Sequence, residues 1–210
     1  MSKSLGNVID PFELVKKYGT DPLRYYLLSE IVPTEDGDFS YEKFEKRYNA
    51  DLAGGIGNLV ARTIAMAIKL NPKSNLPASA MPKALQAGTL NSKWFGHAHH
   101  PELAEGQIQN SNLKKEIAKV NKSCKKNLDD FKFNKALKSI WELISFCDKY
   151  INEQKPWEGN KNALQVVSDI LFALSEIATL LLPFLPDTSD KIKKAIKETR
   201  AEILFPRYEI

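Results

Sequence analysis

The stretch SYEKFEKRYNADLAGGIGNLVARTIAMAIKL, residues 40–70, has the residue pattern of one long helix. Glu42 and Glu45 fall in its expected first turn, where the helix dipole favours negative charge. The positions expected on its buried side recur every three or four residues: Phe44, Tyr48, Leu52, Ile56, Leu59 and Thr63. The glycines at 54, 55 and 57 should each cost about 1 kcal/mol relative to alanine. We therefore expect a close helix–helix approach or a bend at this point.

Helical patterns also cover most of the remaining chain. Asp10 is a typical N-cap residue followed by proline, and Thr20-Asp-Pro opens a second helix in the same way. Further periodicity predicts helices over Gln109–Lys126, Phe131–Asn152, Asn162–Leu182 and Asp187–Lys197, the last with Asp187 as its N-cap. Residues 73–105 are predicted to form a long connection with a short helix near residues 83–88, and a short edge strand is expected near residues 202–205. The sequence therefore predicts an all-α bundle over residues 41–210, preceded by a small, mainly helical segment over residues 1–40.

Composition narrows the class of protein. The 210 residues are 43% hydrophobic and 27% charged, which excludes a disordered or collagen-like chain. We see no apolar run of about 18–20 residues and no signal peptide, so neither a membrane span nor secretion is expected. The two cysteines, Cys124 and Cys147, are typical of a reduced, cytoplasmic protein. His97, His99 and His100 lack a carboxylate or thiol to complete a metal site, so no metal is predicted.

Positive charge is concentrated in the second half of the chain. Residues 1–108 hold 12 basic and 12 acidic residues, whereas residues 109–210 hold 18 and 14. Nine lysines lie between Gln109 and Lys138, against three acidic residues. Such a stretch attracts a polyanion by releasing its counterions. The alternative is an ordinary solvated helix face.

The first residues carry the most specific motif. Residues 1–4, MSKS, resemble the KMSKS signature of class I aminoacyl-tRNA synthetases without its first lysine. Residues 10–14 (DPFEL), 18–28 (YGTDPLRYYLL) and 36–40 (DGDFS) are similar to the stem-contact segment that follows that motif. The resemblance implies that Lys3, with Ser2 and Ser4, stabilises the negative charge that grows on the ATP phosphates during adenylate formation. It also implies that Leu23, Tyr26 and Leu27 would normally have a catalytic domain to pack on.

Three later features resemble the methionyl-tRNA synthetase family in particular. Asn58 and Arg62 lie four residues apart, on one helix face opposite Leu52, Ile56 and Leu59. Residues 150–157, YINEQKPW, place Trp157 in a connecting loop, because Pro156 ends the preceding helix. The ending, residues 182–186 (LPFLP) followed by 204–209 (LFPRYE), is similar to the close of the family's anticodon-binding bundle.

The resemblance implies a specific role for these residues. Asn58 and Arg62 would contact the first anticodon base, a cytosine, and Trp157, following Pro156, would stack on the anticodon. The alternatives are a solvated polar face for Asn58 and Arg62, and a tryptophan that fastens the next helix to the core.

The expected function is the C-terminal portion of a methionyl-tRNA synthetase. This portion would bind the CAU anticodon stem-loop of methionine tRNA for a whole enzyme that uses ATP and Mg²⁺, and neither cofactor is expected on this chain. The expected partners are the tRNA and the family's N-terminal catalytic domain or chain. Without that domain the chain should be inactive alone, and pyrophosphate exchange should stay at background. The alternatives are a tRNA-binding module without catalysis, or the same part of an isoleucyl, valyl, leucyl or cysteinyl enzyme.

Overall fold

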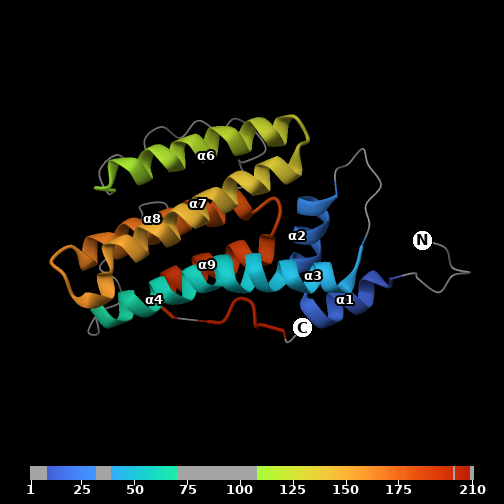
Figure 1. Ribbon diagram of the computed structural model, residues 1–210, viewed down its shortest axis with the longest axis horizontal. Coiled ribbons are helices and arrows are strands. Elements are labelled where there is room, and N and C mark those ends of the chain that lie inside the picture. Colours follow the sequence, from blue (N-terminus) through green and yellow to red (C-terminus); the bar gives the residue numbers. More distant parts are fainter. Residues whose placement is uncertain (1–8, 32–38, 71–107, 201, 209–210) are drawn as a thin grey trace, which may run out of the picture.

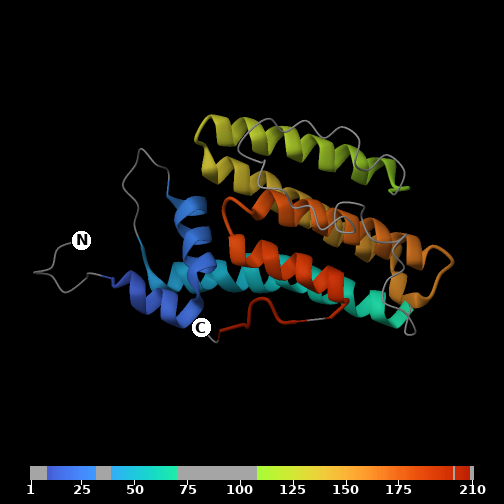
Figure 2. The ribbon, with the colours of Figure 1, turned by 180° about the vertical axis from the view of Figure 1, so that it is seen from behind.

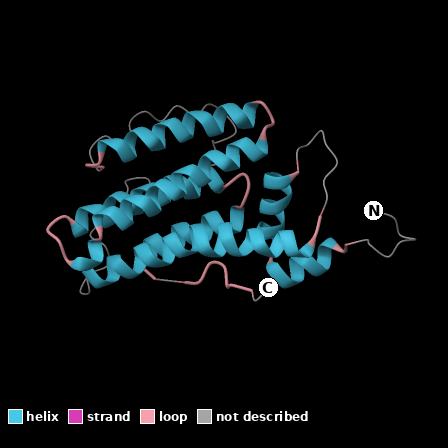
Figure 3. Cartoon of the chain, viewed as in Figure 1, coloured by secondary structure: helices cyan, strands magenta, loops and turns pink. Residues whose placement is uncertain are grey.

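The structure, a computed structural model, describes residues 9–31, 39–70, 108–200 and 202–208. The predicted connection over residues 73–105, with its short helix and histidines, lies outside the described residues. In order along the chain, the helices are α1 (Pro11–Tyr18), α2 (Thr20–Glu30), α3 (Tyr41–Arg47), η2 (Tyr48–Gly57), α4 (Asn58–Leu70), α6 (Ser111–Asp129), α7 (Phe133–Gln154), η5 (Pro156–Glu158), α8 (Ala163–Leu181) and α9 (Pro186–Glu198). The described residues contain no strand, which confirms the all-α prediction (Figure 3).

The long helices run side by side along the long axis of the molecule. Helix α6 packs on α7, α7 on α8, and α8 on both α4 and α9 (Figure 1). The short helix α2 lies across one end of the bundle, where it contacts α7, α9 and η2 (Figure 2). The α7–α8 loop and the end of α4 lie at the opposite end. The bundle therefore has one end covered by α2 and another formed by the end of α4 and the α7–α8 loop.

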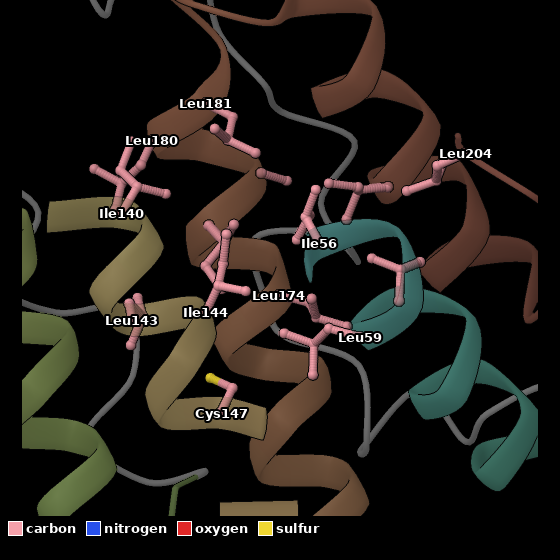
Figure 4. Packing of buried hydrophobic residues seen from close by; sticks show 14 of the residues in the cluster. Ile56, Leu59, Ile140, Leu143, Ile144, Cys147, Leu174, Leu180, Leu181 and Leu204 are labelled. Atoms are coloured by element: carbon pink, nitrogen blue, oxygen red, sulfur yellow. The ribbon is translucent and has the colours of Figure 1, made fainter. Parts of the chain in front are cut away.

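A continuous hydrophobic core joins these helices. The predicted buried positions of the long helix are confirmed, since Leu52, Ile56, Leu59 and Thr63 have no exposed surface. Ile56 and Leu59 point toward α8, which contributes Leu174 to the same cluster (Figure 4). Thr63 is accommodated in the core because its hydroxyl donates to the Leu59 carbonyl at 2.7 Å. Apolar periodicity therefore identifies the buried face of this stretch correctly.

Helix α8 is a longer apolar segment than the sequence analysis recognised. It is long and apolar enough, by length and composition alone, to cross a membrane, although no such segment was expected. Most of it is buried inside the bundle, with α4, α6, α7 and α9 packed around it. Its composition is thus accounted for by its central position in the core.

The first two helices belong to the same core as the bundle. Tyr26 is buried against the rings of Phe39 and Phe44, at centroid distances of 5.1 and 5.5 Å. Leu23 is partly buried, and Leu27 is exposed. Of the three residues expected to pack on a catalytic domain, only Leu27 therefore offers a large exposed apolar side chain.

The glycine-rich part of the long helix is a π-helix. In η2 each turn takes more residues than in an α-helix, so the carbonyl five residues earlier lies close to the glycine. A Cβ atom at Gly54 would lie 2.9 Å from the Asn49 carbonyl oxygen, and one at Gly57 would lie 2.8 Å from the Leu52 carbonyl oxygen. At Gly55 the nearest backbone atom, the Ala50 carbonyl oxygen, is 3.6 Å away. Two of the three glycines are therefore required by the π-helical backbone itself.

This geometry predicts opposite effects for two neighbouring alanine substitutions. Gly57→Ala should lower the free energy of unfolding by about 1–3 kcal/mol, because the added methyl group meets a backbone oxygen that cannot move without distorting the helix. Gly55→Ala is the matched control and should be neutral or stabilising by up to about 1 kcal/mol, through helix propensity. Urea titration measures both. Equal stabilisation by the two substitutions would contradict the π-helical geometry.

Helix α2 holds the turn between α8 and α9 through two side chains. Asp21 Oδ2 accepts from the Thr188 N–H at 2.6 Å and from the Thr188 hydroxyl at 2.7 Å. Arg24 donates to the carbonyls of Phe184 at 2.7 Å and Pro183 at 3.0 Å. The carboxylate of Asp21 thus pairs the backbone N–H of Thr188 at the start of α9, and the guanidinium of Arg24 pairs two carbonyl groups that follow α8. Negative charge at the start of a helix and positive charge at the end of one are both favoured by the helix dipole.

These contacts correct two predicted caps. Asp187 was expected to cap α9, but this helix begins at Pro186, so Asp187 lies in its first turn. Helix α2 has no side-chain cap of the kind that Asp10 gives α1, where the carboxylate accepts from the Phe12 N–H at 2.8 Å. Asp21 instead serves the start of α9, 167 residues away.

The chain after α9 is irregular, so the predicted edge strand near residues 202–205 is wrong. Leu204 and Phe205 are buried, which explains their strand-like apolar pattern without a partner strand. Further along, Asn49 binds both backbone groups of Tyr208: its amide N donates to the carbonyl at 2.7 Å, and its amide O accepts from the N–H at 3.0 Å. A side-chain amide thus takes the place of a neighbouring strand.

Candidate nucleic-acid interface

The loop between α7 and α8 presents Trp157 at one end of the bundle. Helix α7 ends at Gln154, and the next residue, Lys155, caps it: its backbone is left-handed (φ 44°) and its N–H donates to the Ile151 carbonyl at 2.9 Å. Pro156 starts the single 3-10 turn η5 and is buried, and Gly159 (φ 73°) then turns the chain back. Trp157 remains 42% exposed. The local sequence therefore buries the proline and leaves an indole partly open to solvent.

Arg62 of α4 lies against this indole. Its guanidinium carbon is 5.7 Å from the centre of the Trp157 ring, which is a cation–π contact. The segment over residues 40–70 and the loop after Tyr150 therefore meet at the same end of the bundle, as recognition by Arg62 and Trp157 together requires.

Two residues of α7 also contact the guanidinium. Arg62 NH2 donates to Asn152 Oδ1 at 2.9 Å. Arg62 NH1 lies 3.7 Å from Asp148 Oδ1, close enough for an ion pair but too far for a hydrogen bond. Burial raises the pKa of the Asp148 carboxyl, and the Arg62 charge lowers it in part. Asp148 and Asn152 are one helical turn apart, so they form a fork around Arg62.

Asn58 lies one turn before Arg62, at the point where the π-helix gives way to α4. It is half-buried, and its side-chain amide forms no hydrogen bond to any described residue, whereas its backbone N–H donates to the carbonyls of Ala53 and Gly55. Its amide donors and acceptors therefore remain free for a ligand on the helix face that carries Arg62.

Sequence reasoning named Asn58, Arg62, Pro156 and Trp157 but missed Asp148 and Asn152. An acid and an amide one turn apart, just before the Pro-Trp pair, are the signal that could have identified them. Ser2, Lys3 and Ser4, the expected phosphate-contacting residues, lie outside the described residues.

The described part of the chain offers little other chemistry. It contains no group of three or more His, Cys, Asp or Glu side chains that could hold a metal ion. Burial raises the pKa of Cys124 to about 11 and that of Cys147 to about 12. Both thiols are therefore protonated at neutral pH and are poor nucleophiles.

A basic face runs along α6. At 100° per residue, Lys115, Lys119, Lys122 and Lys126 form one row, and the buried Leu113, Ile117, Val120 and Cys124 form the row opposite. Lys119 pairs with Glu116 at 2.8 Å, whereas Lys122 forms no ion pair with a described residue. The predicted solvated face thus exists and carries unpaired positive charge.

Comparisons with known proteins match both parts of the chain. Residues 1–64 match the family model "tRNA synthetases class I (M)", and residues 110–208 match the "Anticodon-binding domain of tRNA ligase". The class is therefore that of the class I aminoacyl-tRNA synthetases. Curated relatives named methionine–tRNA ligase include those of Clostridium acetobutylicum, at 34% identity over 100% of this chain and 33% of the relative, and Thermotoga maritima, at 36% identity over 93% and 28%.

A solved structure gives the same result. The methionyl-tRNA synthetase of Mycobacterium tuberculosis in complex with methionyl-adenylate superposes with a TM-score of 0.71 at 25% identity, covering 99% of this chain and 41% of that one. The chain belongs to the methionyl-tRNA synthetase family. It spans about a third of the length of the curated relatives that it matches.

Proposed function

We propose that the chain supplies anticodon recognition to a cytoplasmic, ATP-dependent methionine–tRNA ligase, and that its partner is the CAU anticodon stem-loop of methionine tRNA. The observation that supports this most strongly is the 5.7 Å contact between Arg62 and Trp157 at one open end of the bundle. Asn58, Arg62 and Trp157 then form a single base-binding site.

The chemistry of the three side chains suits an unpaired cytosine. An exposed indole provides a platform on which a splayed-out base can stack. Guanidinium N–H groups donate to the O2 and N3 acceptors of cytosine, whereas uracil has an N–H donor at position 3. The free amide oxygen of Asn58 can accept from the exocyclic amine of cytosine, which uracil lacks. Stacking therefore supplies affinity, while the polar pair distinguishes the base.

The remaining activity of the whole protein belongs to the same proposal. Joining methionine to tRNA would use ATP with Mg²⁺, and the expected contribution of this chain is phosphate contact by Ser2, Lys3 and Ser4. The catalytic domain that would hold the amino acid and the nucleotide is the proposed protein partner. The described residues contribute RNA recognition to this reaction.

The test is a titration of the chain with two anticodon stem-loops that differ only at the first anticodon base. The wild-type chain should bind the cytosine form more tightly than the uracil form. Arg62→Ala should reduce the difference in binding free energy between the two stem-loops by about 1–3 kcal/mol, the usual contribution of a base-reading pair. Arg62→Lys is the matched control: it keeps the charge but not the planar fork, so it should lose most of the ratio as well. A ratio that survives both substitutions would refute the proposed site.

The basic face of α6 should behave differently in the same titration. Lys122→Ala should weaken binding of both stem-loops equally, because phosphate contacts carry no sequence information. It should also make the negative slope of log K against log salt shallower by about 1, because one phosphate contact is lost. Titration at several salt concentrations measures this slope. A change in the cytosine preference on replacing Lys122 would contradict the assignment.

A further inference from the structure

The carboxyl group of Asp148 has a position that the proposed base contacts do not explain. Its Oδ1 atom is buried and forms no hydrogen bond to any described residue, yet it lies 3.7 Å from Arg62 NH1. Burying a carboxylate without hydrogen bonds is costly, and the raised pKa of Asp148 reflects this cost. A group kept under such conditions beside a binding residue is a candidate for a functional role.

The geometry of the fork shows what Asp148 can do. Asn152 Oδ1 accepts from NH2 of Arg62, and the guanidinium carbon lies over the Trp157 ring. Asp148 attracts NH1 without forming a hydrogen bond to it, so the NH1 donors remain available. A free arginine side chain loses up to about 2 kcal/mol of rotamer entropy when it is fixed. Holding Arg62 in place before the RNA arrives removes that cost from binding.

We propose that Asp148 is a positioning residue, which fixes the Arg62 guanidinium over Trp157 so that its free donors distinguish cytosine from uracil. This inference rests on the proposed function. The negative charge of Asp148 also lies close to bound RNA, where it disfavours every polyanion. Removing the charge should therefore raise affinity for RNA in general while reducing discrimination between bases.

The variant that tests this is Asp148→Asn, which keeps the shape of the side chain and removes its charge. We expect both stem-loops to bind at least as tightly as to the wild type, and the cytosine-to-uracil ratio to fall roughly 3- to 10-fold. Glu153→Gln is the matched control, because Glu153 lies in the same last turns of α7 and, among the described residues, pairs only with the exposed Lys149, at 3.8 Å. It removes the same charge and should leave the ratio unchanged.

Two further measurements separate positioning from a general structural effect. In the Arg62→Ala background, Asp148→Asn should no longer change the ratio, because its effect acts through Arg62. In the free chain, ¹⁵N relaxation of the Arg62 Nε–H group should show an ordered side chain in the wild type and in Glu153→Gln, and a less ordered one in Asp148→Asn.

The outcomes distinguish this inference from the function on which it rests. A wild-type chain without cytosine preference would overturn the proposed function, and this role of Asp148 with it. A preserved wild-type preference overturns the inference alone if Asp148→Asn matches Glu153→Gln, if its effect persists without Arg62, or if Arg62 stays equally ordered.

Discussion

Replacing Asp21 with alanine should lower the free energy of unfolding by about 2–4 kcal/mol, although Asp21 lies far from the candidate RNA site. Asp21 is 3% exposed, and the Thr188 N–H and hydroxyl both donate to its carboxylate. Alanine would leave these two buried donors unpaired at the start of α9, and each such group typically costs about 1–3 kcal/mol. Burial raises the pKa of the Asp21 carboxyl, because removing its charge from water is unfavourable. This cost offsets part of the stability that the two hydrogen bonds provide.

Chemical denaturation of Asp21→Ala, followed by circular dichroism, measures this loss. Asp187→Ala is the matched control: it removes an exposed acid one residue before Thr188 in the same helix turn, and should cost no more than about 1 kcal/mol. Similar losses for the two variants would show that α2 does not cap α9 through Asp21.

The second large effect is expected on RNA binding. Trp157→Ala should weaken binding of the CAU stem-loop by about 1–3 kcal/mol, because it removes the stacking platform. The uracil form should lose a similar amount, since stacking is tolerant of sequence. Folding should change little, because Trp157 is 42% exposed and lies outside the core cluster of the described residues.

A second exposed aromatic residue provides the control for Trp157. Phe131 lies in the turn between α6 and α7, at the opposite end of α7, and is 73% exposed. Phe131→Ala removes a comparable apolar surface, and binding should stay within about twofold of the wild type. Equal losses for Phe131→Ala and Trp157→Ala would indicate non-specific contact with exposed rings rather than a stacking site.

The sequence predicts the helices well because their signals are local. Asp10 before a proline and the spacing of Leu52, Ile56 and Leu59 depend on neighbouring residues, and the structure confirms them. The π-helix was missed because a wheel at 100° per residue assumes an α-helix. Its only sequence signal is the group of glycines at 54, 55 and 57, which also fits a bend. The edge-strand prediction near residues 202–205 is wrong because a short apolar pattern does not specify a strand: Leu204 and Phe205 are buried in an irregular segment.

Contacts between distant residues could not be read from the sequence. Asp21 fits a local cap as well as a contact 167 residues away, and only the packing of α2 on α9 decides between them. The meeting of Arg62 and Trp157 was expected only through resemblance to a family. The spacing of Asp148 and Asn152 is visible in the sequence, but their contact with Arg62 was missed because it depends on the packing of α7 on α4. The division at residue 40 remains a prediction, although the two parts share one core cluster.

The most direct test of the central claim is the ¹H–¹⁵N indole resonance of Trp157 during titration with the CAU stem-loop. The resonance can be assigned by its absence in Trp157→Phe, and Trp141, whose indole nitrogen is buried, serves as an internal reference. If Trp157 is the platform for the anticodon, its resonance should shift and saturate with the same dissociation constant as overall binding, while that of Trp141 stays in place. Saturation of binding with an unchanged Trp157 resonance would place the RNA elsewhere and contradict the account.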